Sequence, residues 1–116
     1  MQSSPFDTLP APLRHRDVTP ADVAAHRDRV RLIDVREPHE YSGELGHIAG
    51  AELVPLATVI DRSADWDSAQ ELVLVCRSGA RSGRAATALA ERGFTRTSNM
   101  VGGMLRWNEE GRPVAR

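Results

Sequence analysis

Short apolar runs alternate along the chain with segments that have helical spacing. The run Leu72–Val75 is apolar at every position, which is typical of a central strand with both faces covered. Apolar-rich runs at 32–35, 51–54 and 97–101 predict three further strands. Because strands that alternate with helices pack in layers, the pattern predicts an α/β sandwich with a mainly parallel sheet.

Helices are predicted from alanine-rich or amphipathic spacing and from the residues at their ends. The segment 81–92 is rich in alanine and is followed by Gly93, a residue suited to a left-handed helix cap. A last helix is expected at about 105–110, after a tight turn formed by the glycine pair at 102–103. A helical turn is expected at 56–62.

The N-terminal part of the chain divides into two segments. Thr19 and Pro20 form a typical helix start, which predicts a helix over 20–29. The preceding residues, 1–16, are rich in proline and have no apolar period, so we expect an extended or flexible lead-in. The remainder, 17–116, is expected to form a single domain.

The composition excludes several classes of function. A chain of 116 residues is long enough for one compact domain and too short for two. The 15 Lys and Arg residues balance the 16 Asp and Glu residues, so neither nucleic acid nor a membrane surface is an expected partner. No apolar stretch has the length of a membrane span, and the first residues lack the features of a secretory signal, so we expect a cytoplasmic protein.

The single cysteine, Cys76, carries the strongest functional signal. One cysteine forms neither an internal disulfide nor a multi-thiolate metal site, and it suits a reducing compartment. The histidines His15, His26 and His39 show no metal-ligand spacing with one another or with carboxylates. We therefore expect neither a metal ion nor another cofactor.

Cys76 lies between the predicted strand at 72–75 and the predicted helix at 81–92. Such a turn gathers backbone N–H groups, the positive end of a helix and two guanidinium groups around one sulfur. All of these favour the thiolate, which is the nucleophilic form. An inert core cysteine is the alternative, but it does not need two arginines and a glycine in the next five positions. The candidate loop residues are Arg77, Ser78, Gly79, Ala80, Arg81 and Ser82.

Asp34 and Arg36 come at the end of another predicted strand, and parallel strands end at the same rim of a sheet. We therefore expect both residues to support the loop that contains Cys76. Asp34 either orients Arg81 or accepts hydrogen bonds from loop N–H groups, or it is simply a turn residue at a strand end. Arg36 and Glu40 are four positions apart, and an ion pair between them is expected to brace the rim.

Five short motifs follow one another along the chain. They are Leu-Ile-Asp-Val-Arg-Glu at 32–37, Glu-Tyr at 40–41, Gly-His-Ile-Ala-Gly-Ala at 46–51 with Pro55, Cys-Arg-Ser-Gly-Ala-Arg-Ser at 76–82, and Gly-Gly-Met at 102–104 with Trp107. In this order, the motifs resemble the rhodanese sulfurtransferase domain, here as a single-domain protein. The resemblance covers about 17–114, nearly the whole chain beyond the lead-in. One departure is that four residues, 42–45, separate Tyr41 from Gly46, where the common pattern has two.

The resemblance implies a three-layer sandwich with a sheet of roughly five strands. It also implies that Cys76 takes a sulfane sulfur from a small sulfur-containing anion such as thiosulfate, or from a persulfide. The resulting enzyme persulfide passes its outer sulfur to cyanide, to a thiol or to a sulfur-relay protein. His47, in a turn-like setting, is expected to be a hydrogen-bonded structural histidine rather than a catalytic base.

Two other functions compete with this hypothesis. Cysteine-dependent phosphatases of a related fold need five residues between cysteine and arginine, whereas four separate Cys76 from Arg81. Val75 also precedes the cysteine where such phosphatases often have histidine. A sulfur carrier without turnover, or a regulatory interaction module, would use the same residues as an enzyme. The sequence therefore favours a sulfurtransferase over a phosphatase, and it leaves the carrier open.

Overall fold

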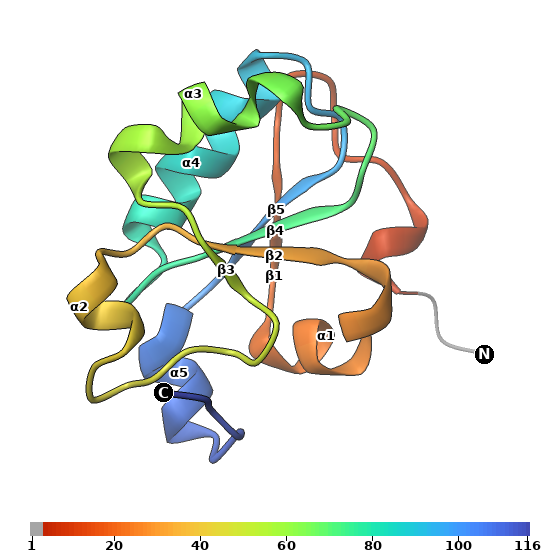
Figure 1. Ribbon diagram of the computed structural model, residues 1–116. Coiled ribbons are helices and arrows are strands. Elements are labelled where there is room, and N and C mark those ends of the chain that lie inside the picture. Colours follow the sequence, from red (N-terminus) through yellow and green to blue (C-terminus); the bar gives the residue numbers. More distant parts are fainter. Residues whose placement is uncertain (1–3) are drawn as a thin grey trace.

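A five-stranded parallel sheet forms the centre of the fold in the computed structural model, which describes residues 4–116 (Figure 1). The strand order is β1-β5-β4-β2-β3, and every neighbouring pair is parallel. This architecture confirms the predicted α/β fold. The strands are β1 (Arg16–Val18), β2 (Arg31–Asp34), β3 (Glu52–Leu53), β4 (Leu72–Val75) and β5 (Thr97–Met100).

Helices cover both faces of the sheet and complete a three-layer sandwich (Figure 1). Helices α1 and α5 lie on one face, and α3 and α4 lie on the other. Short 3-10 turns extend several of these elements. The helices are α1 (Pro20–Ala25), α2 (Pro38–Tyr41), α3 (Val59–Arg62), α4 (Ala80–Glu91) and α5 (Gly103–Glu109).

The central strand β4 explains why its sequence is apolar at every position. Leu72 and Leu74 pack into the core beneath α3 and α4. Val73 and Val75 point the other way, into the core beneath α1 and α5. All four side chains are fully buried, as expected for a strand covered on both faces. Cys76 follows β4 and continues the α4 side of this alternation.

Several predicted elements differ in extent from the observed ones. The capping box between Thr19 and Asp22 confirms the predicted helix start, but α1 ends at Ala25. His26 leaves the helical conformation, with φ of −125°, and a 3-10 turn follows. Helix α2 was not predicted, although Glu37 and Glu40 form a capping box at its start.

The N-terminal segment corrects the predicted lead-in. Residues Pro5–Asp7 form a 3-10 turn, and Phe6 is 1% exposed within the core on the α1 side. Arg29 donates hydrogen bonds to the backbone of this turn and to the carboxylate of Asp7. The strand Arg16–Val18 was also missed. The description as extended or flexible therefore does not fit Pro5–Asp7 or the strand that begins at Arg16, while the first three residues lie outside the described part. The boundary at residue 17 stays a prediction.

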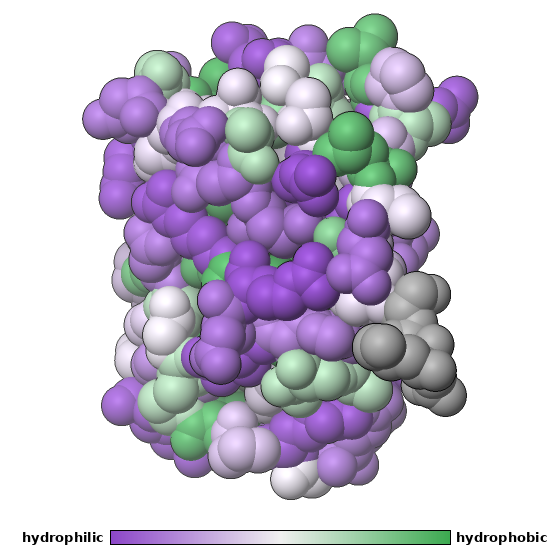
Figure 2. Space-filling view, turned by 90° about the vertical axis from the view of Figure 1, so that its right-hand side faces the viewer, coloured by the Kyte–Doolittle hydropathy of each residue, from purple (hydrophilic) through white to green (hydrophobic). Residues whose placement is uncertain are grey.

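The surface carries no long apolar element among residues 4–116. None of the helices described there has both the length and the apolar character needed to cross a membrane. The face seen from the right of Figure 1 is largely hydrophilic, with apolar residues in small separate patches (Figure 2). Leu9 and Leu13 are the large apolar residues described as exposed, and both belong to the N-terminal segment.

Candidate active site

The loop that contains Cys76 begins where two neighbouring strands end. Asp34, the last residue of β2, is paired in register with Val75, the last residue of β4. The N–H of Val35 donates to the carbonyl of Val75 at 2.9 Å, so the two strands stay together up to the loop. The structure thus brings Asp34 and Cys76 to the same rim of the sheet, where parallel sheets commonly bind ligands.

The sulfur of Cys76 lies in a small cradle of hydrogen-bond donors. The N–H of Gly79 donates to Sγ at 3.0 Å, and the Ser82 hydroxyl lies 3.3 Å from the same atom. Gly79 is the N-cap of the 12-residue helix α4. Its φ of +106° is a backbone conformation that a residue with a side chain would adopt only with strain. The positive end of α4 therefore points at a cysteine that is 1% exposed.

Two opposing effects set the pKa of Cys76. Burial raises the pKa, because it disfavours the charged thiolate. Hydrogen bonds from the Ser82 hydroxyl and from the N–H groups of Ser82, Gly79 and Ser78 lower it. The hydrogen bonds outweigh the burial, so the pKa of the thiol lies below its ordinary value. The loop can therefore stabilise a thiolate without a metal ion.

Helix α5 donates backbone hydrogen bonds to the loop that contains Cys76. The N–H of Met104 donates to the carbonyl of Cys76 at 2.9 Å, and that of Leu105 donates to the carbonyl of Arg77 at 3.0 Å. Gly103 has φ of +55°, and a Cβ there would lie 2.5 Å from both carbonyl oxygens. Only glycine fits this close approach. The sequence predicted a tight turn at this position but not its contact with the cysteine loop.

Arg81 forms an ion pair with Glu40, which the sequence analysis had paired with Arg36. Its two terminal nitrogens bind the two carboxylate oxygens of Glu40 at 2.7 and 2.8 Å. The Arg81 hydrogen bonds are the main reason that the pKa of Glu40 falls to about 2. The predicted Arg36–Glu40 ion pair is therefore wrong. Arg36 donates to the backbone carbonyl of Glu40 and not to its carboxylate. The short helix α2 aims the Glu40 side chain across the rim instead.

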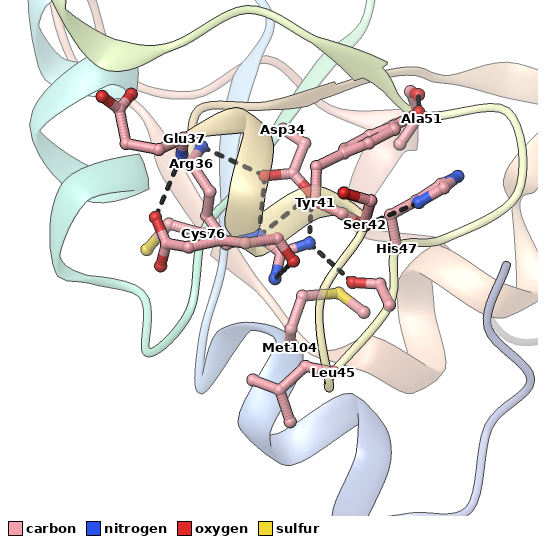
Figure 3. A network of polar contacts seen from close by, with 12 residues as sticks. Asp34, Arg36, Glu37, Tyr41, Ser42, Leu45, His47, Ala51, Cys76 and Met104 are labelled. Carbon is pink, nitrogen blue, oxygen red and sulfur yellow. Dashed lines mark hydrogen bonds and ion pairs between the residues drawn. The ribbon is translucent and has the colours of Figure 1, made fainter. Parts of the chain in front are cut away.

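Arg36 forms a buried ion pair with Asp34 (Figure 3). The closest N–O distance is 2.8 Å, and the two side chains are 1% and 0% exposed. Arg36 also donates to the carbonyl of Gly46 at 2.7 Å, which ties down the loop after α2. Asp34 accepts from the backbone N–H and the guanidinium of Arg36, so neither of the two functional contacts considered for Asp34 is observed.

His47 has the structural role that the sequence predicted. Its Nδ1 lies 2.9 Å from the carbonyl oxygen of Tyr41, and the two rings are stacked with centroids 3.7 Å apart. The Tyr41 hydroxyl in turn donates to the carbonyl of Ala51. Figure 3 shows this stack beside the Asp34–Arg36 pair. His47 and Tyr41 therefore fix the conformation of the 41–51 loop, because all three contacts lie within it.

A pocket of about 350 Å³ opens over this rim. The 42–45 segment supplies part of its wall through Gly43, Glu44 and Leu45. Arg77 is exposed there and forms no ion pair within residues 4–116. In the described part of the chain, no three His, Cys, Asp or Glu side chains are grouped as a metal site. The lining residues are Arg36, His39, Glu40, Gly43, Glu44, Leu45, Arg77 and Leu105.

Asn99 in β5 was not singled out by the sequence. Its Oδ1 accepts a hydrogen bond from the Ser82 hydroxyl at 2.6 Å, and Asn99 is 8% exposed. A lone asparagine within a strand has no motif around it, so only the packing of α4 on β5 reveals this contact. The structure therefore adds Asn99 and Glu40 to the residues around the cysteine loop.

Comparison with known proteins supports a relationship over most of the chain. Residues 19–110 match the family described as Rhodanese-like domain. The chain is 33% identical over 90 residues to a protein named Sulfurtransferase from Allochromatium vinosum, covering 78% of this chain and 82% of that protein. It is 35% identical over 102 residues to the Thiosulfate:glutathione sulfurtransferase of Saccharomyces cerevisiae, covering 77% and 72% respectively.

The solved structures agree with the sequence comparisons. The crystal structure of a rhodanese-related protein from Thermoplasma volcanium superposes with a TM-score of 0.77 at 28% identity, covering 86% of this chain and 97% of that one. The shared fold and the family match over 19–110 give one conclusion. This chain belongs to the Rhodanese-like domain family.

Proposed function

We propose that this protein is a sulfurtransferase that carries a sulfane sulfur on Cys76 as a persulfide. The observation that carries the proposal is the environment of Sγ, with the Gly79 N–H at 3.0 Å and the Ser82 hydroxyl at 3.3 Å. A thiolate and a persulfide anion both place negative charge at this position. Donors fixed by the fold stabilise such charge without having to reorganise.

In the first half-reaction, the Cys76 thiolate attacks the outer sulfur of thiosulfate. A bond forms between Sγ and that sulfur, while the sulfur–sulfur bond of the donor breaks and its electron pair leaves on sulfite. The total charge stays the same, and no external oxidant or reductant is needed. The role of Arg77, exposed at the pocket, is to attract the anionic donor.

In the second half-reaction, a nucleophile attacks the outer sulfur of the persulfide. Cyanide leaves as thiocyanate, and a thiolate leaves as a new persulfide. In each case the electron pair of the broken bond returns to Sγ of Cys76, which restores the thiolate. The cradle around Sγ favours this leaving group for the same reason that it favours the nucleophile.

The pocket supports a low-molecular-weight thiol as acceptor. Its wall combines cationic Arg77 with the carboxylate of Glu44, and its volume of about 350 Å³ lies within the range of small-molecule sites. A thiol with both ammonium and carboxylate groups, such as glutathione, matches this mixture of charges. The name of the yeast relative includes glutathione, which supports the same proposal. A reducing compartment such as the cytoplasm would supply such a thiol.

The test is steady-state turnover of thiosulfate with cyanide or glutathione as acceptor. Wild type should form thiocyanate or sulfite continuously, while Cys76→Ser should form none and unfold at a similar urea concentration. Turnover by Cys76→Ser would overturn the proposal. One equivalent of sulfite followed by no turnover with any small acceptor would instead indicate a sulfur carrier that needs a protein partner.

A further inference from the structure

The Ser82 hydroxyl has two hydrogen-bond acceptors but only one proton to donate. It lies 2.6 Å from Oδ1 of Asn99 and 3.3 Å from Sγ of Cys76. All three residues are buried or nearly so, and Ser82 is fully buried. The hydroxyl can therefore satisfy only one of the two acceptors at a time.

The orientation of the Asn99 amide follows from its other neighbour. Its Nδ2 lies 3.4 Å from a carboxylate oxygen of Asp17, which can only accept. The amide oxygen must then face Ser82. Gly83 of helix α4 lies beside this amide, and a Cβ at that position would be in ordinary van der Waals contact with Nδ2, at 3.4 Å. The hydrogen bonds to Asp17 and Ser82 thus orient the Asn99 amide so that its oxygen accepts the Ser82 proton.

We propose that Asn99 is a positioning residue that competes with Cys76 for the Ser82 hydroxyl. While Cys76 is a thiol, its S–H donates to Ser82, and the Ser82 hydroxyl donates to Asn99. When the thiolate forms, the hydroxyl turns to Sγ and the amide oxygen of Asn99 loses its partner. Asn99 therefore disfavours formation of the thiolate. The resting cysteine stays protonated up to a higher pH than it would in the same loop without Asn99.

This inference rests on Cys76 as the proposed nucleophile, but its test does not depend on sulfur transfer. The readout is the pH dependence of the rate of iodoacetamide alkylation of Cys76. Asn99→Leu removes the acceptor, so the midpoint should fall by about half a pH unit to one unit, the equivalent of one net hydrogen bond. Ser82→Ala removes the donor, so the midpoint should rise.

The double variant separates this role from a merely structural one. If Asn99 acts through the Ser82 hydroxyl, Asn99→Leu in the Ser82→Ala background should leave the midpoint unchanged. Charged groups that face the loop are the same in all variants, so their effects cancel in this comparison. They are Asp17 from β1, Asp34 at the end of β2, Arg36 in the segment after β2, Glu40 from α2, Arg77 from the loop and Arg81 from α4.

Asn99→Ala provides a second variant that removes the acceptor, in case leucine does not fit beside Gly83. A midpoint that does not fall in the folded Asn99 variant would overturn the proposal. An equal fall with and without the Ser82 hydroxyl would overturn it as well. A protein that passes this test but transfers no sulfur would retain the positioning role and lose the proposed function, so the two failures are distinguishable.

Discussion

Replacing Glu40 by glutamine removes the negative charge that holds Arg81 at the rim. The side chain keeps its size, but one of the two oxygens that accept from Arg81 becomes an NH₂ group. In the wild type these contacts are 2.7 and 2.8 Å long. The variant therefore tests how much the Glu40–Arg81 pair contributes to the stability of the folded rim.

The magnitude follows from the pKa of Glu40, which falls from 4.5 to about 2 in the folded protein. Such a change corresponds to at most about 3 kcal/mol of folding free energy. The Arg81 and Glu40 side chains are 29% and 19% exposed, and solvent screening reduces the expected value to about 1–2 kcal/mol. Because the folded pKa is depressed, this stabilisation is present above pH 4.5 and is lost as the pH falls towards 2.

The assay is urea unfolding of wild type and Glu40→Gln at pH 7 and at pH 3. The variant should be less stable by about 1–2 kcal/mol at pH 7, and more than half of this difference should disappear at pH 3. Glu44→Gln is the matched control, since Glu44 is exposed on the same pocket and forms no ion pair within residues 4–116. A difference that is equal at both pH values would refute the assignment to the Glu40 charge.

Three further substitutions, two at the site and one in the N-terminal segment, are each measured by urea unfolding at pH 7. Gly103→Ala places a Cβ 2.5 Å from two carbonyl oxygens. Gly93 also has a positive φ, but a Cβ there would have nothing within 4 Å. Gly93→Ala should therefore lower the free energy of unfolding by about 1–2 kcal/mol, and Gly103→Ala should lower it by at least twice as much. Equal costs would mean that the contact with the cysteine loop is unimportant. Arg36→Ala leaves Asp34 buried without a partner and should cost about 3–5 kcal/mol, against less than about 1 kcal/mol for Arg106→Ala at an exposed pair. A loss as small as that of Arg106→Ala would contradict the buried pair. Phe6→Ala should cost about 3–5 kcal/mol, whereas Leu13→Ala on the exposed part of the same segment should be nearly neutral. A neutral Phe6→Ala would restore the flexible lead-in.

The parts of the site that could be predicted from the sequence are contiguous in the chain. The apolar run Leu72–Val75 indicates a strand covered on both faces, and the structure buries all four side chains. The turn after Cys76 contains its own glycine and leads directly into α4. Local spacing is enough to predict such elements, because strand, loop and helix follow one another without a gap.

The contacts that could not be predicted join residues far apart in sequence. Glu40 binds Arg81 from 41 positions away, and Ser82 donates to Asn99 across 17 positions. The spacing of Arg36 and Glu40 suggested an ion pair, but burial of Arg36 against Asp34 leaves Glu40 free for Arg81. Partner choice of this kind depends on which side chain the fold buries, and a pattern of spacings does not contain that information.

Phe6 was missed for a different reason. A single aromatic residue among prolines has no periodicity, so nothing in the sequence marks it as part of the core. In the structure it packs beneath α1 and makes an edge-on contact with His26. The apolar contact of the 3-10 turn with the core comes from this one side chain rather than from an amphipathic pattern.

The most direct test of the proposed function is the intact mass of the protein after incubation with thiosulfate and removal of the small molecules. We predict that wild type gains the mass of one sulfur atom, located on the peptide that contains Cys76, and that cyanide or dithiothreitol removes it. Cys76→Ser should gain nothing under the same conditions. Wild type that stays at its original mass, or an equal gain on Cys76→Ser, would contradict a persulfide on Cys76.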